Sequence, residues 1–150
     1  MGTLGLGVVG CGTISKTYLK RLPGFDVLRL VAVADVRDGV AEKQAAEHGI
    51  PRWYDSTEAL LADPDVDLVL NLTPPLMHAE VALAALRAGK HVYNEKPLAA
   101  TLEQGRQLVA GFRRPPESSA AVEDHGDPGK PDAPGPQPVR RGGGLAEHGG

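Results

Sequence analysis

The pattern of apolar and polar positions divides the chain, from Thr3 to about Arg113, into short apolar runs separated by segments of helical periodicity. Apolar runs rich in Val and Leu predict strands at residues 4–9, 27–34, 52–54, 66–72 and 91–94. The segments between them predict helices at residues 13–22, 38–48, 57–62, 79–88 and from 101 to about 111. Strands that alternate with helices form mostly parallel sheets covered on both faces. The pattern therefore predicts an α/β fold.

Local signals refine the predicted helix boundaries and faces. In the first helix, Ile14, Tyr18 and Leu22 fall on one apolar stripe. Ser56 is expected to cap the third helix, and Thr101 is expected to form a capping box with the glutamine three positions later. These caps satisfy amides that have no partner inside a helix.

The composition changes abruptly after residue 114. Gly and Pro make up 15 of the 36 residues from 115 to 150, and the large aliphatic residues there are Val122, Val139 and Leu145. Such a segment buries too little apolar surface to offset the entropy lost on ordering. We therefore expect one domain at 1–114 and a disordered Gly/Pro-rich tail at 115–150.

Charge and cysteine content exclude several classes of protein. Residues 1–114 hold 13 basic and 13 acidic residues, without the basic excess that nucleic-acid binders need. The single cysteine, Cys11, cannot form an intrachain disulfide, and no metal-ligand spacing occurs. The N-terminus carries no signal-peptide pattern, and no apolar run approaches about 18 residues. We expect a cytoplasmic protein with neither a nucleic-acid partner nor a membrane partner.

A glycine-rich turn joins the first predicted strand to the first predicted helix. Residues 10–15 read Gly-Cys-Gly-Thr-Ile-Ser, which is G-x-G-x-x-S rather than G-x-G-x-x-G. Gly10 permits a tight turn, and Gly12 lets the backbone approach a pyrophosphate. The helix start, with Thr13 and Ile14, offers free amides and a positive dipole end. The turn predicts a dinucleotide-binding site in a Rossmann-like fold.

An acidic residue follows the second predicted strand at the spacing expected for such a site. Asp35 lies 23 residues after Gly12, close to the roughly 20-residue interval at which a carboxylate meets the adenosine ribose. A carboxylate there favours NAD because it repels a 2′-phosphate. Arg37 could instead receive that phosphate with two hydrogen bonds. We expect NAD as the cofactor, with NADP possible.

Two further segments follow predicted buried strands, where ligands bind in open α/β sheets. After the fourth strand, Thr73, Pro74 and His78 offer a hydroxyl, a rigid loop wall and an imidazole as cofactor contacts. After the fifth strand, residues 95–97 read Glu-Lys-Pro, in which Pro97 fixes the direction of the chain. We expect both segments to line the cofactor site.

Four motifs in this order resemble a known family. Val-Val-Gly-Cys-Gly-Thr-Ile-Ser at 8–15, Val-Ala-Val-Ala-Asp at 31–35, Thr-Pro-Pro-x-x-His at 73–78 and Glu-Lys-Pro at 95–97 are similar to the NAD(P)-binding domain of the Gfo/Idh/MocA oxidoreductases, named for glucose-fructose oxidoreductase and inositol dehydrogenase. The resemblance covers residues 3 to about 111.

The resemblance implies a catalytic role for Lys96, which would contact the cofactor ribose and the substrate hydroxyl. Glu95 would orient Lys96 or point to solvent. Members of this family act on sugars, polyols or related compounds, and they continue into a second domain that supplies the substrate pocket. We expect the present chain to be a truncated member that binds the cofactor and has negligible turnover alone.

Two other functions remain open from the sequence. One is a non-catalytic module that binds a dinucleotide for regulation or redox sensing, and such a module does not need Lys96. The other is a methyltransferase that binds S-adenosylmethionine, which shares the glycine turn and the acidic residue but leaves Glu-Lys-Pro unexplained. Titration with a dinucleotide and with S-adenosylmethionine separates the methyltransferase. The sensor is separated by Lys96→Ala, which should remove most turnover from an enzyme restored with its second domain.

Overall fold

The computed structural model describes residues 2–113. The predicted tail at 115–150 lies outside these residues. No helix in the described range is long and apolar enough to cross a membrane.

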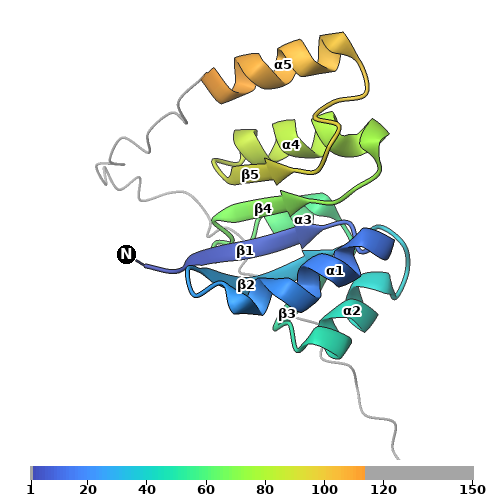
Figure 1. Ribbon diagram of the computed structural model, residues 1–150, viewed down its shortest axis with the longest axis vertical. Helices are drawn as coiled ribbons and strands as arrows, with labels where there is room; N and C mark the ends of the chain where they lie inside the picture. The colour runs from blue at the N-terminus through green and yellow to red at the C-terminus, as the bar shows by residue number, and fades with distance from the viewer. Residues whose placement is uncertain (1, 114–150) are drawn as a thin grey trace, which may run out of the picture. The chain divides into compact units, whose positions relative to one another are not determined.

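The described residues form one parallel sheet in the order β3-β2-β1-β4-β5 (Figure 1). The strands are β1 (Leu4–Val9), β2 (Leu28–Ala34), β3 (Arg52–Tyr54), β4 (Leu68–Asn71) and β5 (His91–Asn94). Three have the predicted bounds, whereas β2 begins one residue late and β4 is shortened at both ends. The direction in which the chain adds strands reverses at β1, so that β1 and β4 flank the point where ligands bind in doubly wound sheets.

The pairing register between β1 and β2 shifts by one residue between Leu6 and Gly7. Leu6 pairs with Leu30, but Gly7 pairs with Ala32. Val31 is therefore an extra residue, and it is buried on the same side of the sheet as Ala32. An extra residue of this kind turns the remainder of its strand relative to the partner strand.

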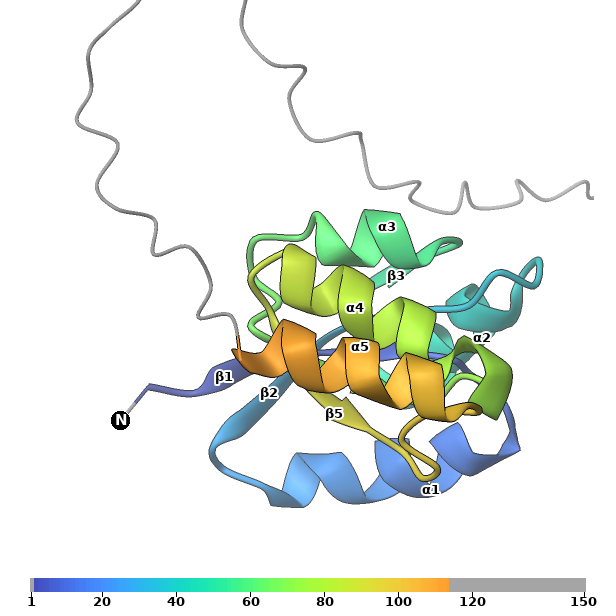
Figure 2. The same ribbon diagram turned by 90° about the horizontal axis from the view of Figure 1, so that it is seen from above.

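Helices cover both faces of the sheet, as predicted (Figure 2). They are α1 (Thr13–Arg21), α2 (Val40–His48), α3 (Thr57–Leu61), α4 (His78–Arg87) and α5 (Leu102–Arg113), with short 3-10 turns at Leu22–Gly24 and Pro75–Met77. In Figure 2, α1 lies on one side of the sheet, α3 and α4 lie on the other, and α5 lies against α4.

Two of the three apolar clusters in the described residues lie against the strand β1. One core contains Leu6 and Val8 from β1 together with Leu19 from α1 and residues of α2. The other contains Val9 and Val69 with residues of α3 and α4. Successive side chains of a strand point to opposite faces. The apolar run of β1 therefore fills both cores.

The predicted stripe of α1 is wrong at Ile14, whereas Leu22 is buried in the core and Tyr18 packs against it. The buried residues of α1 are Ser15 and Leu19, whereas Ile14 is 44% exposed and Tyr18 is partly buried. Ile14 is the second residue of α1 and lines the pocket described below rather than the sheet. Apolar periodicity alone does not distinguish a residue that faces the core from one that faces a ligand pocket.

The predicted helix caps are largely present. The Ser56 hydroxyl accepts a hydrogen bond of 3.2 Å from the amide of Ala59. The Thr101 hydroxyl accepts one of 3.2 Å from the amide of Gln104. The reciprocal bond differs from the capping-box prediction, because the Gln104 amide oxygen accepts from the amide of Ala100 rather than from that of Thr101.

Candidate functional site

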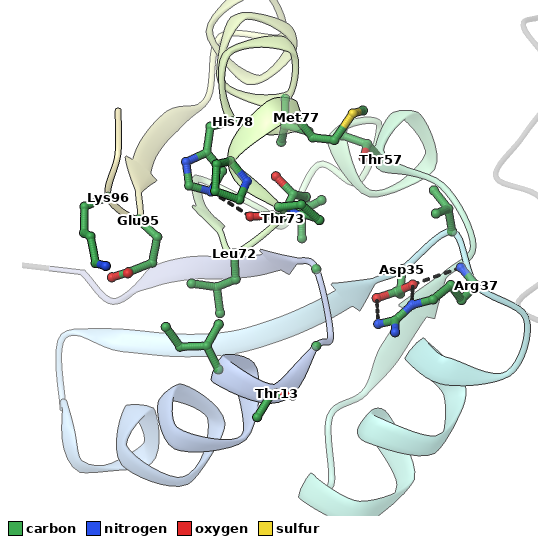
Figure 3. Close-up of a pocket in the computed structure, with 18 residues that line it drawn as sticks. Thr13, Asp35, Arg37, Thr57, Leu72, Thr73, Met77, His78, Glu95 and Lys96 are labelled. Carbon is green, nitrogen blue, oxygen red and sulfur yellow. Dashed lines mark hydrogen bonds and ion pairs between the residues drawn. The ribbon is translucent and has the colours of Figure 1, made fainter. Parts of the chain in front are cut away.

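A pocket of about 680 Å³ opens at the carboxyl ends of β1, β2 and β4 (Figure 3). All but one of the cofactor-site residues predicted from the sequence line this pocket. These lining residues are Gly10, Gly12, Thr13, Ile14, Asp35, Arg37, Thr73, Pro74, His78, Glu95 and Lys96. Pro97 is not among them, although its backbone contacts a lining side chain as described below.

The two glycines of the turn have different roles. Gly10 has a φ of +96°, and a Cβ built there would lie 2.7 Å from the carbonyl carbon of Leu72. A side chain at Gly10 is therefore excluded by both conformation and space. A Cβ at Gly12 would meet nothing within 4 Å, so the backbone there borders open space. Gly10 shapes the turn, and Gly12 leaves room in front of it.

The start of α1 provides a favourable environment for an anion. Gly12 is the N-cap residue, no side chain caps the helix, and its first turn contains no acidic residue. The first amides of a helix have no partner within the helix and carry the positive end of its dipole. These donors and the open space at Gly12 fit the pyrophosphate of a dinucleotide.

Asp35 holds the glycine-rich turn against the end of β2. One of its carboxylate oxygens, Oδ2, accepts a 2.9 Å hydrogen bond from the amide of Cys11. The guanidinium of Arg37 lies against both oxygens, with Nε 2.9 Å from Oδ1 and Nη2 2.8 Å from Oδ2. Hydrogen bonds from Arg37 hold the pKa of Asp35 at about 2, against the opposing effect of burial. Asp35 is therefore a buried anion, whereas the Arg37 side chain is 60% exposed.

Cys11 lies within the turn without a catalytic partner. Its thiol is buried, and the Sγ atom lies 3.6 Å from the carbonyl oxygen of Ala34. Burial, with a further contribution from the charge of Asp35, raises the pKa of Cys11 to about 12. The thiolate is the nucleophilic form. Cys11 is thus a packing residue at physiological pH.

The loop after β4 is held by a buried asparagine. Asn71 is fully buried, and its Oδ1 atom accepts a 2.6 Å hydrogen bond from the hydroxyl of Thr73. Its Nδ2 atom donates to the carbonyl oxygen of His78 at 3.0 Å and to Oδ1 of Asn94 at 2.8 Å. The Thr73 hydroxyl is therefore engaged within the protein, although the residue lines the pocket.

His78 begins α4 and is 1% exposed. Its Nε2 atom lies 2.6 Å from the carbonyl oxygen of Thr73, and its Nδ1 atom lies 2.6 Å from that of Pro97. Both polar atoms of the ring thus face backbone carbonyl groups. His78 borders the pocket without a free polar atom to offer a ligand.

Glu95 and Lys96 lie at the end of the pocket away from Asp35 and Arg37, as Figure 3 shows. The hydroxyl of Tyr18, in α1, donates to Oε1 of Glu95. This hydrogen bond is the main cause that raises the pKa of Tyr18 to about 12. Lys96 is exposed, and the Lys96–Pro97 peptide bond is cis.

Sequence reasoning missed several residues of the pocket wall. Among them are Val36, which is 80% exposed, Thr57 and Met77. Val36 lies between Asp35 and Arg37 in the sequence, and this position could have identified it as a residue of the pocket. Thr57 and Met77 come from α3 and the turn before α4, so only the fold brings them together. Within residues 2–113, no cluster of His, Cys, Asp and Glu suits a metal ion.

Comparison with known proteins places these features in a family. Residues 4–117 match the family described as "Oxidoreductase family, NAD-binding Rossmann fold", GFO_IDH_MocA. A 1,5-anhydro-D-fructose reductase of Ensifer adhaerens is 42% identical over 110 residues, which cover 71% of this chain and 32% of the relative. A myo-inositol 2-dehydrogenase of Thermotoga maritima is 32% identical over 104 residues, covering 69% and 31%.

Solved structures agree with this assignment. The 3-ketoreductase KijD10 of Actinomadura kijaniata, in complex with NADP and TDP-benzene, matches with a TM-score of 0.70 and 34% identity, over 75% of this chain and 34% of that one. The WlbA dehydrogenase of Bordetella pertussis, in complex with NADH and UDP-GlcNAcA, matches with a TM-score of 0.68 and 30% identity, over 73% and 34%. The chain spans about a third of the length of these proteins.

Proposed function

The chain belongs to the Gfo/Idh/MocA oxidoreductase family, and we propose that residues 1–114 form the cofactor-binding part of an NAD(P)-dependent oxidoreductase that acts on a sugar, a polyol or a related compound. One observation carries this proposal. The amide-lined turn, the Asp35 carboxylate and Lys96 border a single pocket at the carboxyl edge of a parallel sheet. A cytoplasmic location is part of the same proposal.

The two ends of the pocket suit different parts of a dinucleotide. Gly12, Thr13 and Ile14 would hold the pyrophosphate through backbone amides. Asp35 and Arg37 would meet the adenosine ribose, and Lys96 would lie at the nicotinamide end. When bound, the cofactor would supply hydride transfer. The residues of this chain would orient the cofactor and interact with its charged groups.

The ion pair between Asp35 and Arg37 supports the use of either cofactor. With NAD, the Asp35 carboxylate would accept hydrogen bonds from the ribose hydroxyls. With NADP, the exposed Arg37 side chain would turn from Asp35 to the 2′-phosphate, which accepts two hydrogen bonds from a guanidinium. We propose NAD as the main cofactor, because Asp35 keeps its negative charge in both cases and repels the added phosphate.

Lys96 is the proposed catalytic residue, since a lysine at the nicotinamide end can donate a hydrogen bond to a substrate oxygen or exchange a proton with it. Turnover also requires the substrate carbon to be held near the nicotinamide. The matched region is about a third of each relative. We therefore propose that this chain alone binds the cofactor with negligible turnover.

Isothermal titration calorimetry with NAD, NADP and S-adenosylmethionine tests the proposal. We expect binding of both dinucleotides and none of S-adenosylmethionine. A folded protein that ignores both dinucleotides at millimolar concentration contradicts the proposal. The non-catalytic alternative is tested by Lys96→Ala in a protein that carries the second domain of a relative, because loss of turnover with retained NADH binding argues for an enzyme rather than a sensor.

A further inference from the structure

A polar network with Asn71 and His78 buried at its centre joins the carboxyl ends of β4 and β5. We call it the β4–β5 bridge and define it as the side chains of Asn71, Thr73, His78 and Asn94. Asn71 is its centre, with hydrogen bonds to Thr73, to the backbone of His78 and to Asn94. Asn94 also donates from Nδ2 to the carbonyl oxygen of Leu98 at 3.2 Å. The bridge thus spans residues 95–97, which we call the Lys96 segment, from Asn94 before it to the backbone of Leu98 after it.

The imidazole of His78 makes the two shortest backbone contacts of the bridge. Each of its nitrogens lies 2.6 Å from a carbonyl oxygen, one belonging to Thr73 and the other to Pro97. A carbonyl group only accepts, so each contact needs an N–H on the ring. The neutral imidazole donates to one of the two carbonyl groups, and the imidazolium donates to both.

The two carbonyl groups belong to the two segments that follow β4 and β5. Thr73 and Pro74 form the loop that follows β4, and both line the pocket. Pro97 directly follows Lys96, the residue at the nicotinamide end. One buried side chain therefore fixes the separation between the cofactor loop and the Lys96 segment, which lie more than 20 residues apart in the sequence.

The remainder of the network keeps His78 in place. The carbonyl oxygen of His78 accepts from Asn71, and Asn71 is fully buried. The edge strand β5 is also tied to β4 here, because the amide of Glu95 donates to the carbonyl oxygen of Asn71 at 3.2 Å. Buried polar groups that all find partners favour one arrangement of the chain over others.

We propose that His78, supported by Asn71 and Asn94, is a positioning residue that sets the Lys96 segment against the cofactor loop and so builds the nicotinamide half of the site. The inference rests on the proposed function and deepens it. His78 acts through two carbonyl groups and makes no polar contact with the cofactor. The adenosine half, formed by the glycine turn and Asp35, does not depend on it.

ADP-ribose, which lacks the nicotinamide, separates the two halves of the site. We would measure dissociation constants for NADH and ADP-ribose by calorimetry with the full chain and with His78→Gln. Loss of a buried hydrogen bond should weaken NADH binding by at least about fivefold. ADP-ribose affinity should change by less than about twofold, within the scatter expected for an undisturbed contact. The exposed His91, at the opposite end of β5, provides the control variant His91→Gln, which should change neither affinity.

Asn94→Ala is a second variant, because Asn94 is only partly buried and its replacement removes a support of the bridge while the His78 side chain is retained. It should also weaken NADH binding more than ADP-ribose binding, and this variant decides the question if His78→Gln does not fold. Equal effects on both ligands, or no effect on either, overturn the inference and leave the proposed function intact. Wild-type protein that binds ADP-ribose as tightly as NADH also overturns it. Wild-type protein that binds neither ligand contradicts the proposed function itself.

Discussion

The guanidinium of Arg37 binds both carboxylate oxygens of Asp35, two residues earlier in the chain. The pair lies at the proposed adenosine end of the pocket, with the carboxylate buried and most of the guanidinium exposed. The Asp35 oxygens already accept hydrogen bonds from Arg37 and from the amide of Cys11, so the carboxylate can accept from a ribose only if this contact changes. In the proposed function, the balance between NAD and NADP therefore depends on how the pair opens.

Replacement of Arg37 by alanine should change cofactor preference. We expect Arg37→Ala to weaken NADP binding by about tenfold or more, the size of a lost charge-assisted contact. NAD binding should be unchanged or tighter, because the Asp35 carboxylate is then free to accept hydrogen bonds from the ribose. Calorimetric titration with both cofactors measures the ratio. An equal loss of affinity for both would contradict a specific role for Arg37.

The low pKa of Asp35 makes a pH-dependent contribution to stability. Because the pKa in the fold is about 2, below the ordinary value of 3.8, the stabilisation is fully present above pH 4 and is lost as pH falls towards 2. The melting temperature of wild-type protein should exceed that of Asp35→Asn near neutral pH. This difference should shrink between pH 4 and pH 2, as followed by circular dichroism. A constant difference over this range would refute the assignment.

The raised pKa of Cys11 predicts an unreactive thiol. With a pKa of about 12, almost no thiolate is present at pH 8, and the side chain is buried. Iodoacetamide should therefore label Cys11 slowly in native protein and readily in urea, as measured by mass spectrometry. The stabilisation from the neutral buried thiol is present below pH 9.0, the ordinary value, and is lost as pH rises to about 12. Rapid native labelling at pH 8 would show that the turn opens.

The two glycines of the turn should respond differently to substitution. Gly10→Ala should destabilise the fold, because the positive φ costs an alanine about 1–3 kcal/mol and the added carbon overlaps the backbone of Leu72. Urea unfolding measures this loss. An unchanged unfolding midpoint would contradict the tight contact with Leu72.

Gly12→Ala is the matched substitution, since a Cβ there meets no protein atom. Its unfolding midpoint should remain close to that of the wild type. NADH affinity should fall by about tenfold or more, because the methyl group occupies space proposed for the pyrophosphate. Unimpaired NADH binding by a folded Gly12→Ala protein would place the pyrophosphate elsewhere.

Much of the fold follows from local sequence, because each strand carries its own apolar signal. The bounds of β1, β3 and β5 agree with the prediction, and so does the cap at Ser56. The error at Ile14 has a physical cause, since an apolar side chain beside a ligand pocket has the same periodicity as one in a core. The family model and the parallel sheet confirm the predicted fold class.

The internal contacts of the site were less accessible to sequence reasoning. The His78 ring and the carbonyl group of Pro97 are 19 positions apart, and their contact exists only because β4 and β5 pair in register. Likewise, nothing in the local sequence links Tyr18 to Glu95. A motif identifies which residues gather at the edge of a sheet, whereas their mutual hydrogen bonds depend on tertiary structure.

The extra residue in β2 decides which side chain the pocket receives. Without the shift at Val31, Ala34 rather than Asp35 would follow in line with Gly10, and the carboxylate would point to the opposite face of the sheet. The direction of the Asp35 carboxylate therefore depends on the pairing register of β2 as well as on the acidic residue at the end of the strand. Loss of Val31 itself would leave residues 32–34 paired with residues 7–9, so Asp35 would still lie level with Gly10.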